Sequence, residues 1–585
     1  MGPDRGSCLT RPVGGSTTSG ARTVLSAGIP IEVVLASAAA GSGGPTFIVD
    51  GNVVEPVALD QPVELIADGG LGRLYESLLE SDDRRSLGAF YTPTEVAAGL
   101  VAQVVIDGTV VDPACGSGVF LQAAARKLFD LGVGSPAEIV KERLFGADID
   151  PLAVAVCRWN LASWAGISVD EVTGIVAGDP LRNGMAVWGD GPVGGFDAVV
   201  GNPPFLGQLR GTTVRNAAER EDLKARFGDL VGAYTDTAWL FLALGMELLA
   251  KGARMALIQP QSVLAARDAE PLRIDLRNRG CLEALWFDRS KVFAGNTEVC
   301  ALIVERSSCS RSVRLLVDRE VVPAGEVAAP EAGIQWGGLV AGLIGIPSVD
   351  LARSCSGVGR VGDLAAVTAG FRQHYYGLVP AVREHAGAFD ESPRLITTGL
   401  VDPLHCKWSK RYARFAGRAW TAPVVETDLV LAEDLAVGEW IEARLRPKLL
   451  LASQTRVIEV VVDVTGDMVP VTPLVILEPE EEDLWKLAAA LSAPPVTAWV
   501  AKLTIGAARA SGRIKLSAHQ ASELPLPMDD RAWSEGEALA HQIWESAGSA
   551  SSGTWLAFGS AMCRAYGVME TPVLEWWWEH HPGRV

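Results

Sequence analysis

The sequence predicts an α/β protein whose main domain is a doubly wound, mostly parallel sheet, followed by a second domain of mixed α/β type. Its 585 residues, of which 48% are hydrophobic, exceed what a single core organises. Between Leu71 and Glu305, short apolar runs alternate with amphipathic stretches, the pattern of parallel strands joined by crossover helices. Past Arg306 this alternation gives way to segments interrupted by proline and glycine.

Short apolar runs mark seven strands in the first domain, preceded by a helix at 71–80. The strands are expected at 109–112, 144–148, 174–177, 196–200, 254–259, 282–287 and 299–305. Helices fall between most of them. The last two strands are separated by a short loop that contains Gly295-Asn296, so we expect them to form an antiparallel hairpin that closes the sheet.

Four regions follow from this pattern. Residues 1–70 are an N-terminal extension, partly disordered because of its Gly/Ser/Thr-rich tracts. The first domain covers 71–320, and the second covers 345–530, with short strands such as 457–462 and 474–477. Residues 531–585 are expected to be helical and contain several tryptophans.

Composition excludes several classes of protein. Nine cysteines without a Cys-x-x-Cys pair and seven scattered histidines argue against a disulfide framework and against a metal site, and favour a reduced, cytoplasmic compartment. The sequence contains no long apolar span, so we expect no membrane helix. The net charge of -19 has the wrong sign for a protein that covers nucleic-acid phosphates broadly, so any such contact must be local.

A strand, a turn of small residues and a helix start follow one another in Val110-Val111-Asp112-Pro113-Ala114-Cys115-Gly116-Ser117-Gly118-Val119-Phe120. Gly116 and Gly118 let the backbone approach a ligand closely, at the sheet edge where doubly wound folds bind nucleotides. Taken alone, the run is equally compatible with a structural turn, because short motifs match by chance.

Acidic residues also end the next two strands. Asp148, followed by Ile149, can accept hydrogen bonds from both hydroxyls of a ribose. Asp179, followed by Pro180, can accept from the amino group of an adenine. Together with Asp112, these residues outline an adenosine site. The lysine motif of a P-loop is absent from the sequence, which argues against a phosphate-cleaving enzyme.

The fourth strand ends in Asn202-Pro203-Pro204-Phe205. Two prolines cannot continue a central strand and fix their own φ, so the Asn202 amide and the Pro203 carbonyl form a rigid pair of acceptors. Such a pair would orient a planar NH2 group and favour its lone pair as a nucleophile. A bare turn is the alternative, but the neighbouring acids favour a site.

These features fit transfer of a methyl group from S-adenosyl-L-methionine to an amino group. The cofactor carries an activated methyl, so the protein supplies alignment and desolvation and needs neither a metal nor a Ser/His/Asp arrangement. The loop Gly88-Ala89-Phe90-Tyr91-Thr92-Pro93 can fold over the methionine end of the cofactor.

A base in a duplex must leave the stack before it reacts, at a cost of a few kcal/mol. Stacking on an aromatic ring offsets roughly 1 to 3 kcal/mol per face. Phe205 is one candidate face, and Phe293, between the last two strands, is the other. Ordinary packing within the hairpin is an equally weighted alternative for Phe293.

In this order, the motifs resemble the γ-class N6-adenine DNA methyltransferases of restriction-modification and phage-defence systems, the N-6 DNA methylase family. The match rests on the Phe90-Tyr91-Thr92-Pro93 element, the Asp112 to Gly118 run, Asn202-Pro203-Pro204-Phe205 and the long region behind them. It covers roughly 71–527. The resemblance implies a Rossmann-like class I methyltransferase domain, with a seven-stranded, mostly parallel sheet and a final antiparallel strand, followed by a target-recognition domain.

The resemblance also implies roles for individual residues. The residues expected around the cofactor are Tyr91, Thr92, Asp112, Ala114, Gly116, Gly118, Asp148, Ile149, Asp179 and Pro180. Those expected to hold a flipped-out adenine are Asn202, Pro203, Pro204, Phe205 and Phe293. Gly370, Arg446-Pro447-Lys448 and Arg513-Ile514-Lys515 look like parts of the recognition region. The implied partners are double-stranded DNA and other restriction or phage-defence subunits.

A basic stretch lies in the second domain. Residues 407–418 contain five cations and three aromatic residues and no acid, a composition that suits a local nucleic-acid contact. The candidate DNA contacts are Lys407, Lys410, Arg411 and Arg414. The alternative is a solvated basic surface.

Three other functions remain open alternatives. A restriction enzyme with its own nuclease would need a Pro-Asp and an acid-x-Lys together in an extra domain, whereas Pro3-Asp4 and Asp222-Leu223-Lys224 lie far apart. RNA and protein-glutamine methyltransferases also use an Asn-Pro-Pro-aromatic motif, but lack such a long second domain. The third alternative is a DNA-binding subunit of a defence complex.

Overall fold

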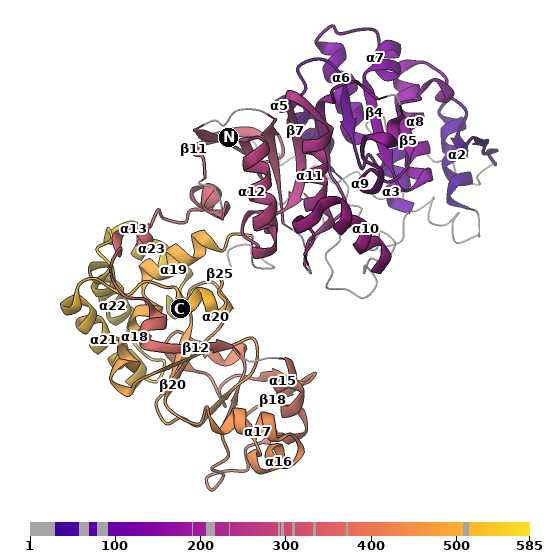
Figure 1. The fold of residues 1–585 in the computed structure, drawn as a ribbon. Coiled ribbons are helices and arrows are strands. Elements are labelled where there is room, and N and C mark those ends of the chain that lie inside the picture. The colour runs from indigo at the N-terminus through magenta and orange to yellow at the C-terminus, as the bar shows by residue number, and fades with distance from the viewer. Residues whose placement is uncertain are drawn as a thin grey trace, which may run out of the picture. The chain divides into compact units, whose positions relative to one another are not determined.

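The computed structural model describes residues 30–57, 70–78, 92–189, 191–205, 217–232, 234–289, 293, 298–306, 311–330, 335–369, 372–506 and 514–584. The chain divides into two compact units, Met1–Gln335 and Trp336–Val585, so 345–530 and 531–585 fall within one unit (Figure 1). Pro3-Asp4, Gly88 to Tyr91, Gly295-Asn296, Gly370 and Arg513 lie outside the described residues.

A nine-stranded sheet forms the centre of the first unit, in the order β11-β10-β8-β9-β7-β6-β3-β4-β5. The strands are β3 (Val110–Asp112), β4 (Leu144–Asp148), β5 (Ile175–Ala177), β6 (Phe196–Gly201), β7 (Leu249–Pro260), β8 (Cys281–Phe287), β9 (Val299–Glu305), β10 (Ser312–Val317) and β11 (Val322–Ala328). From β7 to β5 all neighbours are parallel. Each predicted strand is present, which confirms the α/β class.

The expectation of seven strands closed by a hairpin is wrong at one edge. β8 and β9 are antiparallel, but β9 lies between β8 and β7 and therefore does not close the sheet. β10 pairs parallel with β8, and β11 pairs antiparallel with β10. In β10 the side chains of Val313 and of Leu315 to Val317 are buried, which stabilises this additional strand. β11 is almost fully exposed and carries Pro323, as an edge strand allows.

Helices cover both faces of this sheet, as the alternation of side chains along β7 makes clear. Ala256 and Ile258 join a core cluster with residues of α3, α5, α6 and α8. Met255 and Leu257 point the other way, toward Gly245 of α11. The helices are α3 (Gly70–Leu78), α5 (Thr94–Val104), α6 (Val119–Asp130), α7 (Pro136–Glu142), α8 (Pro151–Ala165), α9 (Pro180–Asn183), α10 (Ala217–Phe227), α11 (Thr237–Leu248) and α12 (Glu270–Arg279) (Figure 1).

The N-terminal segment at 30–57 is part of the first unit. It folds as α2 (Ile31–Gly41), β1 (Ile48–Val49) and β2 (Asn52–Val53), and α2 adds buried side chains to the same core cluster. Trp159 of α8 donates its indole N–H to the Pro45 carbonyl at 2.7 Å, and Gly44 lies against the Trp159 ring. These contacts fasten the segment to α8.

The second unit is of mixed α/β type. One four-stranded sheet has the order β12 (Ala365–Ala369), β24 (Val475–Pro479), β20 (Lys448–Leu451), β22 (Val460–Asp463), and the other has β13 (Val382–Glu384), β19 (Pro423–Val425), β14 (Arg394–Ile396), β23 (Met468–Pro470). Two-stranded pairs are β15 (Val401–Asp402) with β16 (His405–Cys406), β17 (Ala413–Phe415) with β18 (Arg418–Trp420), and β21 (Gln454–Thr455) with β25 (Ile514–Lys515).

Helices complete the second unit. They are α13 (Leu351–Ser354), α14 (Val361–Leu364), α15 (Arg372–Leu378), α16 (Thr427–Glu433), α17 (Leu435–Glu442), α18 (Leu484–Ser492), α19 (Pro494–Leu503), α20 (Ala518–Ser522), α21 (Asp530–Glu545), α22 (Ser552–Ala565) and α23 (Glu570–His580). The C-terminal tryptophans have a packing role, since Trp577 is buried and its ring packs against Trp555 and His581.

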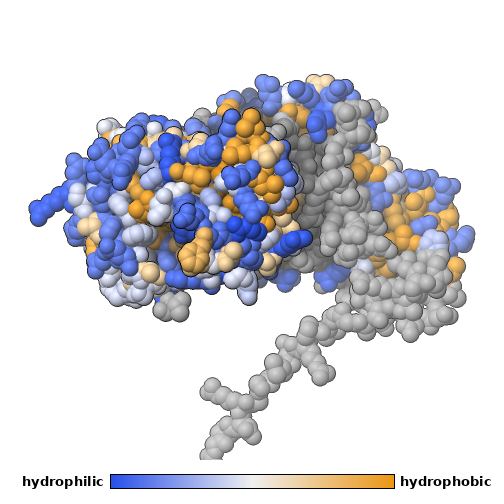
Figure 2. Space-filling model, turned by 90° about the horizontal axis from the view of Figure 1, so that it is seen from below, coloured by the Kyte–Doolittle hydropathy of each residue, from blue (hydrophilic) through white to orange (hydrophobic). Residues whose placement is uncertain are grey.

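The surface mixes both kinds of side chain. Figure 2 shows a face on which hydrophobic residues form patches between hydrophilic ones. Among the residues that the structure describes, no helix is both long and apolar enough to cross a lipid bilayer.

Candidate active site

Four neighbouring parallel strands bring the candidate residues to one edge of the sheet. The strands β6, β3, β4 and β5 lie side by side, and their carboxyl ends carry Asn202, Asp112, Asp148 and Asp179 in that order. The chain leaves β3 toward β4 on one side, while β6 lies on the other. A crevice at such a reversal of strand order is where doubly wound folds bind ligands.

Tight turns fix the acidic residues. Asp112, Asp148 and Asp179 each accept a hydrogen bond from the backbone N–H two residues further on, at 3.0 Å in every case. Asp112 and Asp179 are followed by proline, which pre-sets the backbone for the turn into a helix. One carboxylate oxygen of Asp112 and of Asp179 is used in this way, and the second can face a ligand.

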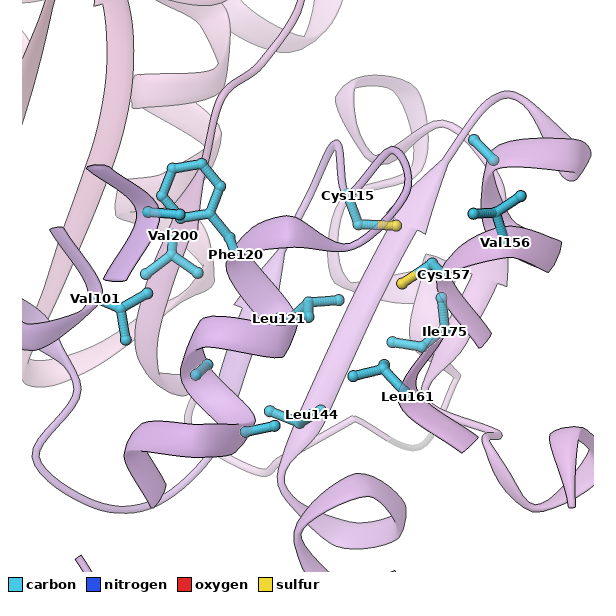
Figure 3. Close-up of a cluster of buried hydrophobic side chains, with 14 of the residues drawn as sticks. Val101, Cys115, Phe120, Leu121, Leu144, Val156, Cys157, Leu161, Ile175 and Val200 are labelled. Carbon is cyan, nitrogen blue, oxygen red and sulfur yellow. The ribbon is translucent and has the colours of Figure 1, made fainter. Parts of the chain in front are cut away.

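The glycine-containing turn between β3 and α6 packs tightly on its inner side. A Cβ at Gly118 would lie 2.5 Å from the Cys157 sulfur of α8. Figure 3 shows Cys115 and Cys157, two free cysteines, turned toward each other in this core. Outward, a Cβ at Gly116 would meet nothing within 4 Å, and the Gly116 N–H donates to Asp148 at 2.9 Å. The open side of the turn therefore faces the ends of β3 and β4.

The Asn-Pro-Pro-Phe segment lies directly beside this turn. Gly201 adopts a φ of 152°, and a Cβ there would lie only 2.6 Å from an oxygen of Asp112. The Asn202 Nδ2 donates to the Thr92 hydroxyl at 3.1 Å, and Thr92 is buried. This bond joins two motifs that lie 110 residues apart in the chain and directs the amide with Oδ1 as its acceptor.

Gly201→Ala is expected to destabilise the first unit by roughly 1 to 3 kcal/mol, because alanine is strained at this φ and its methyl collides with Asp112. Thermal unfolding of the variant checks this effect. Gly342→Ala is the control, since a Cβ there meets nothing within 4 Å; equal melting temperatures for the two variants would contradict this account.

The two candidate aromatic residues border one core cluster. Phe205 is half-buried and packs against the cluster that contains Phe293. Phe293 is buried, and its ring centroid lies 6.4 Å from that of Trp286 in β8, an edge-on contact. This contact fits the packing role that is the alternative to base stacking for Phe293. Both rings stay candidates for stacking a base.

Burial sets the electrostatics of the site. It raises the pKa of Asp112 to about 8, and the nearby Asp148 adds to the shift. Burial also raises the pKa of Asp148, against the lowering effect of the Asp150 and Gly116 N–H groups. A buried acid with a raised pKa beside an open turn is suited to a cationic ligand.

These residues fit S-adenosylmethionine. Ile149, between two aspartates, is 64% exposed and offers an apolar face beside the acids. A separate cavity of about 290 Å³ lies between α3, α5 and α6, and Asp112, Asp148 and Asp179 are not among the residues that line it. An apolar surface for adenine, acids for hydroxyls and a buried carboxylate for an ammonium match the parts of this cofactor.

Sequence reasoning overlooked Tyr75 and Asp150. Asp150 caps α8 by accepting from the Leu152 N–H at 2.9 Å, and the Tyr75 hydroxyl donates to Asp150 at 2.5 Å. Asp150-Pro151 is an N-cap followed by proline, a signal that the sequence contains. Nothing near Tyr75 in the sequence indicates its distant partner.

The basic stretch of the second unit is partly paired. Lys407 and Arg411 both form ion pairs with Asp402, at 3.3 and 3.1 Å. Arg414 is exposed on β17, and Lys410 lies 3.5 Å from the Ala547 carbonyl. Lys410 and Arg414 are therefore the cations best placed for an external phosphate.

Residues 67–321 match the model of the N-6 DNA methylase family. A stretch of 198 residues, 33% of this chain and 37% of its relative, is 27% identical to the type I restriction enzyme EcoEI methylase subunit of Escherichia coli. Another of 233 residues, 39% of this chain and 46% of its relative, is 28% identical to the type II methyltransferase M.TthHB8I of Thermus thermophilus. The matches span less than half the length of these relatives.

Among solved structures, the chain is similar to the type IIL restriction-modification enzyme MmeI in complex with DNA. The alignment covers 89% of this chain and 82% of that chain, with a TM-score of 0.59 and 14% sequence identity. At this identity the likeness concerns the fold.

Proposed function

We propose, from the premise that residues 67–321 belong to the N-6 DNA methylase family, that the protein is a site-specific DNA methyltransferase acting on the N6 amino group of a flipped-out adenine. One observation carries the proposal. Gly201, at the end of β6 and next to Asn202 in the chain, lies directly against Asp112 at the end of β3, so the acceptor of an amino group adjoins the cofactor turn.

The chain's residues would act by binding and alignment. The carboxylates of Asp148 and Asp179 would accept from the ribose and the adenine of the cofactor, and Asp112 would face its ammonium group. S-adenosylmethionine, when bound, supplies an electrophilic methyl group. The Asn202 Oδ1 and the Pro203 carbonyl would accept the two amino hydrogens of the target adenine and direct its lone pair toward that methyl.

Stacking would hold the target base out of the duplex. Phe205 and Phe293 offer ring faces, and each stacked face is worth roughly 1 to 3 kcal/mol against the few kcal/mol of lost base stacking. The second unit would supply the contacts to the remaining DNA. Other restriction or defence subunits are proposed partners on the strength of the relatives' names.

The direct test is methyl transfer by the purified protein with isotopically labelled S-adenosylmethionine and double-stranded DNA of mixed sequence. Mass spectrometry of the digested DNA should find N6-methyladenine. If the label enters RNA or a protein glutamine and not DNA, the protein is an RNA or a protein-glutamine methyltransferase. Cofactor binding without transfer to any acceptor would favour a DNA-binding subunit.

Cofactor affinity is expected to rise as the pH increases toward 8. Below a pKa of about 8, Asp112 is protonated and lacks the charge that would face the ammonium group, so binding at pH 7 should release a proton. Calorimetry in buffers of different ionisation enthalpy measures this release. Asp112→Asn should bind more weakly and without the proton release; a wild type that releases none would contradict the assignment.

Lys410→Ala combined with Arg414→Ala should weaken DNA binding and flatten its salt dependence. Each lost phosphate contact makes the slope of log K against log salt shallower by about 0.9. The slope of the double variant should therefore be shallower than that of the wild type by about 1.8. Lys486→Ala is the control, because Lys486 lies on α18 beside Asp483. An unchanged slope in the double variant would remove these residues from the interface.

A further inference from the structure

The helix α3 contacts both turns of the candidate cofactor site. Its apolar stripe, Leu71, Leu74, Tyr75 and Leu78, is buried in the core cluster that also contains Phe120 of α6 and Val156 of α8. Spacings of three and four residues place this stripe on one helical face. The helix is therefore held firmly enough for its polar atoms to orient other groups.

Tyr75 begins a chain of hydrogen bonds that ends at the glycine-containing turn. Its hydroxyl donates to one oxygen of Asp150, whose other oxygen accepts the Leu152 N–H. The Asp150 N–H donates to Asp148 at 3.0 Å, and the second Asp148 oxygen accepts the Gly116 N–H at 2.9 Å. Both Asp148 oxygens are thus oriented by backbone N–H groups, one from the Asp150 turn and one from the glycine-containing turn.

The next residue on α3 reaches the other turn. Glu76 accepts a hydrogen bond from the Ser117 hydroxyl at 3.1 Å, and the buried Asn160 Nδ2 donates to the Ser117 carbonyl at 3.0 Å. A Cβ on Gly72 would lie 2.9 Å from the Ser117 hydroxyl oxygen, so the helix backbone itself approaches this turn. Ser117 stands between Gly116 and Gly118.

We propose that α3 is a positioning element for the cofactor: Tyr75, acting through Asp150, and Glu76, acting through Ser117, hold both turns in the conformation that binds S-adenosylmethionine. This inference rests on the proposed function and adds two residues outside the recognised motifs. Burial and the neighbouring Asp150 raise the pKa of Tyr75 well above its usual value, so the Tyr75 hydroxyl stays protonated and can donate.

The physical basis is preorganisation. A turn that is already held in its binding conformation loses less conformational freedom on binding, so its ligand binds more tightly. The hydrogen bond from Tyr75 is to a carboxylate, a class stronger than bonds between neutral groups. Replacing Tyr75 by phenylalanine removes this hydrogen bond but keeps the buried ring, so the packing of α3 changes little.

Tyr75→Phe should therefore raise the Kd for S-adenosylmethionine about tenfold, measured by calorimetry on the full chain without DNA. The KM for the cofactor should rise in parallel, with kcat at saturating cofactor within about twofold of wild type. Tyr566→Phe is the matched control. Tyr566 is equally buried, and its hydroxyl donates to the Pro525 carbonyl in the second unit.

A double-mutant cycle tests whether Tyr75 acts through Asp150. In an Asp150→Asn background, Tyr75→Phe should change the Kd by less than about twofold; a full tenfold loss there would overturn the relay. Equal affinities of the wild type, Tyr75→Phe and Tyr566→Phe would overturn the inference while leaving the proposed function intact. A wild-type protein that does not bind S-adenosylmethionine would overturn both.

Discussion

Asn202→Ala is expected to lower the rate of methyl transfer by at least about 10²- to 10³-fold, the loss that follows removal of one preorganised hydrogen-bonding group from a reacting centre. The Asn202 amide is fixed by its bond to the buried Thr92, so it can accept from an amino group without reorganising. Single-turnover rates with saturating DNA and cofactor measure the effect.

Cofactor affinity should stay close to that of the wild type, because Asn202 is assigned to the target amino group, whereas the cofactor is assigned to Asp112, Asp148 and Asp179. Thr92→Val is a graded control. It keeps the shape of the side chain but removes the hydroxyl that accepts from Asn202, so the rate should fall by less than in Asn202→Ala. A fully active Asn202→Ala variant would contradict the role of the amide.

Asp463→Ala is expected to destabilise the second unit by about 3 to 5 kcal/mol, the cost of leaving a buried charge without its partner. Lys448 and Asp463 form an ion pair in which both side chains are fully buried. Asp463 also accepts the Gly466 and Met468 N–H groups, each at 3.0 Å, and so fixes the turn between β22 and β23. Burial lowers the pKa of Lys448, against the opposing effect of Asp463.

Urea unfolding followed by circular dichroism gives the loss. The matched control is Glu535→Ala in the same unit, where the Arg564–Glu535 pair has side chains that are 48% and 54% exposed. Its removal should cost less than about 1 kcal/mol. Equal losses for the two variants would mean that the buried pair is not the anchor that its geometry indicates.

The central strands could be predicted from the sequence because parallel strands covered on both faces appear as continuous apolar runs. β4, for example, has the expected bounds. The edge pair β10 and β11 was overlooked, since β11 is exposed and resembles a loop. The turn that fixes Asp179 could also be foreseen, because an aspartate followed by proline marks a helix start.

Contacts between distant segments could not be foreseen. The bond from Asn202 to Thr92 and the bond from Tyr75 to Asp150 join residues 110 and 75 positions apart, and no local pattern encodes either. The pairing of Lys407 and Arg411 was hidden for a related reason. Their common partner, Asp402, lies just upstream of the basic stretch and looked unrelated to it.

We propose that the chain methylates adenine at N6 within a specific DNA sequence. The most direct measurement is to express it in a host that lacks adenine methylation and to sequence the genomic DNA by a modification-sensitive method, with Asn202→Ala in parallel. We expect N6-methyladenine at one sequence motif with the wild type and none with the variant. Unmodified DNA from cells that contain the folded, cofactor-binding wild type would contradict it.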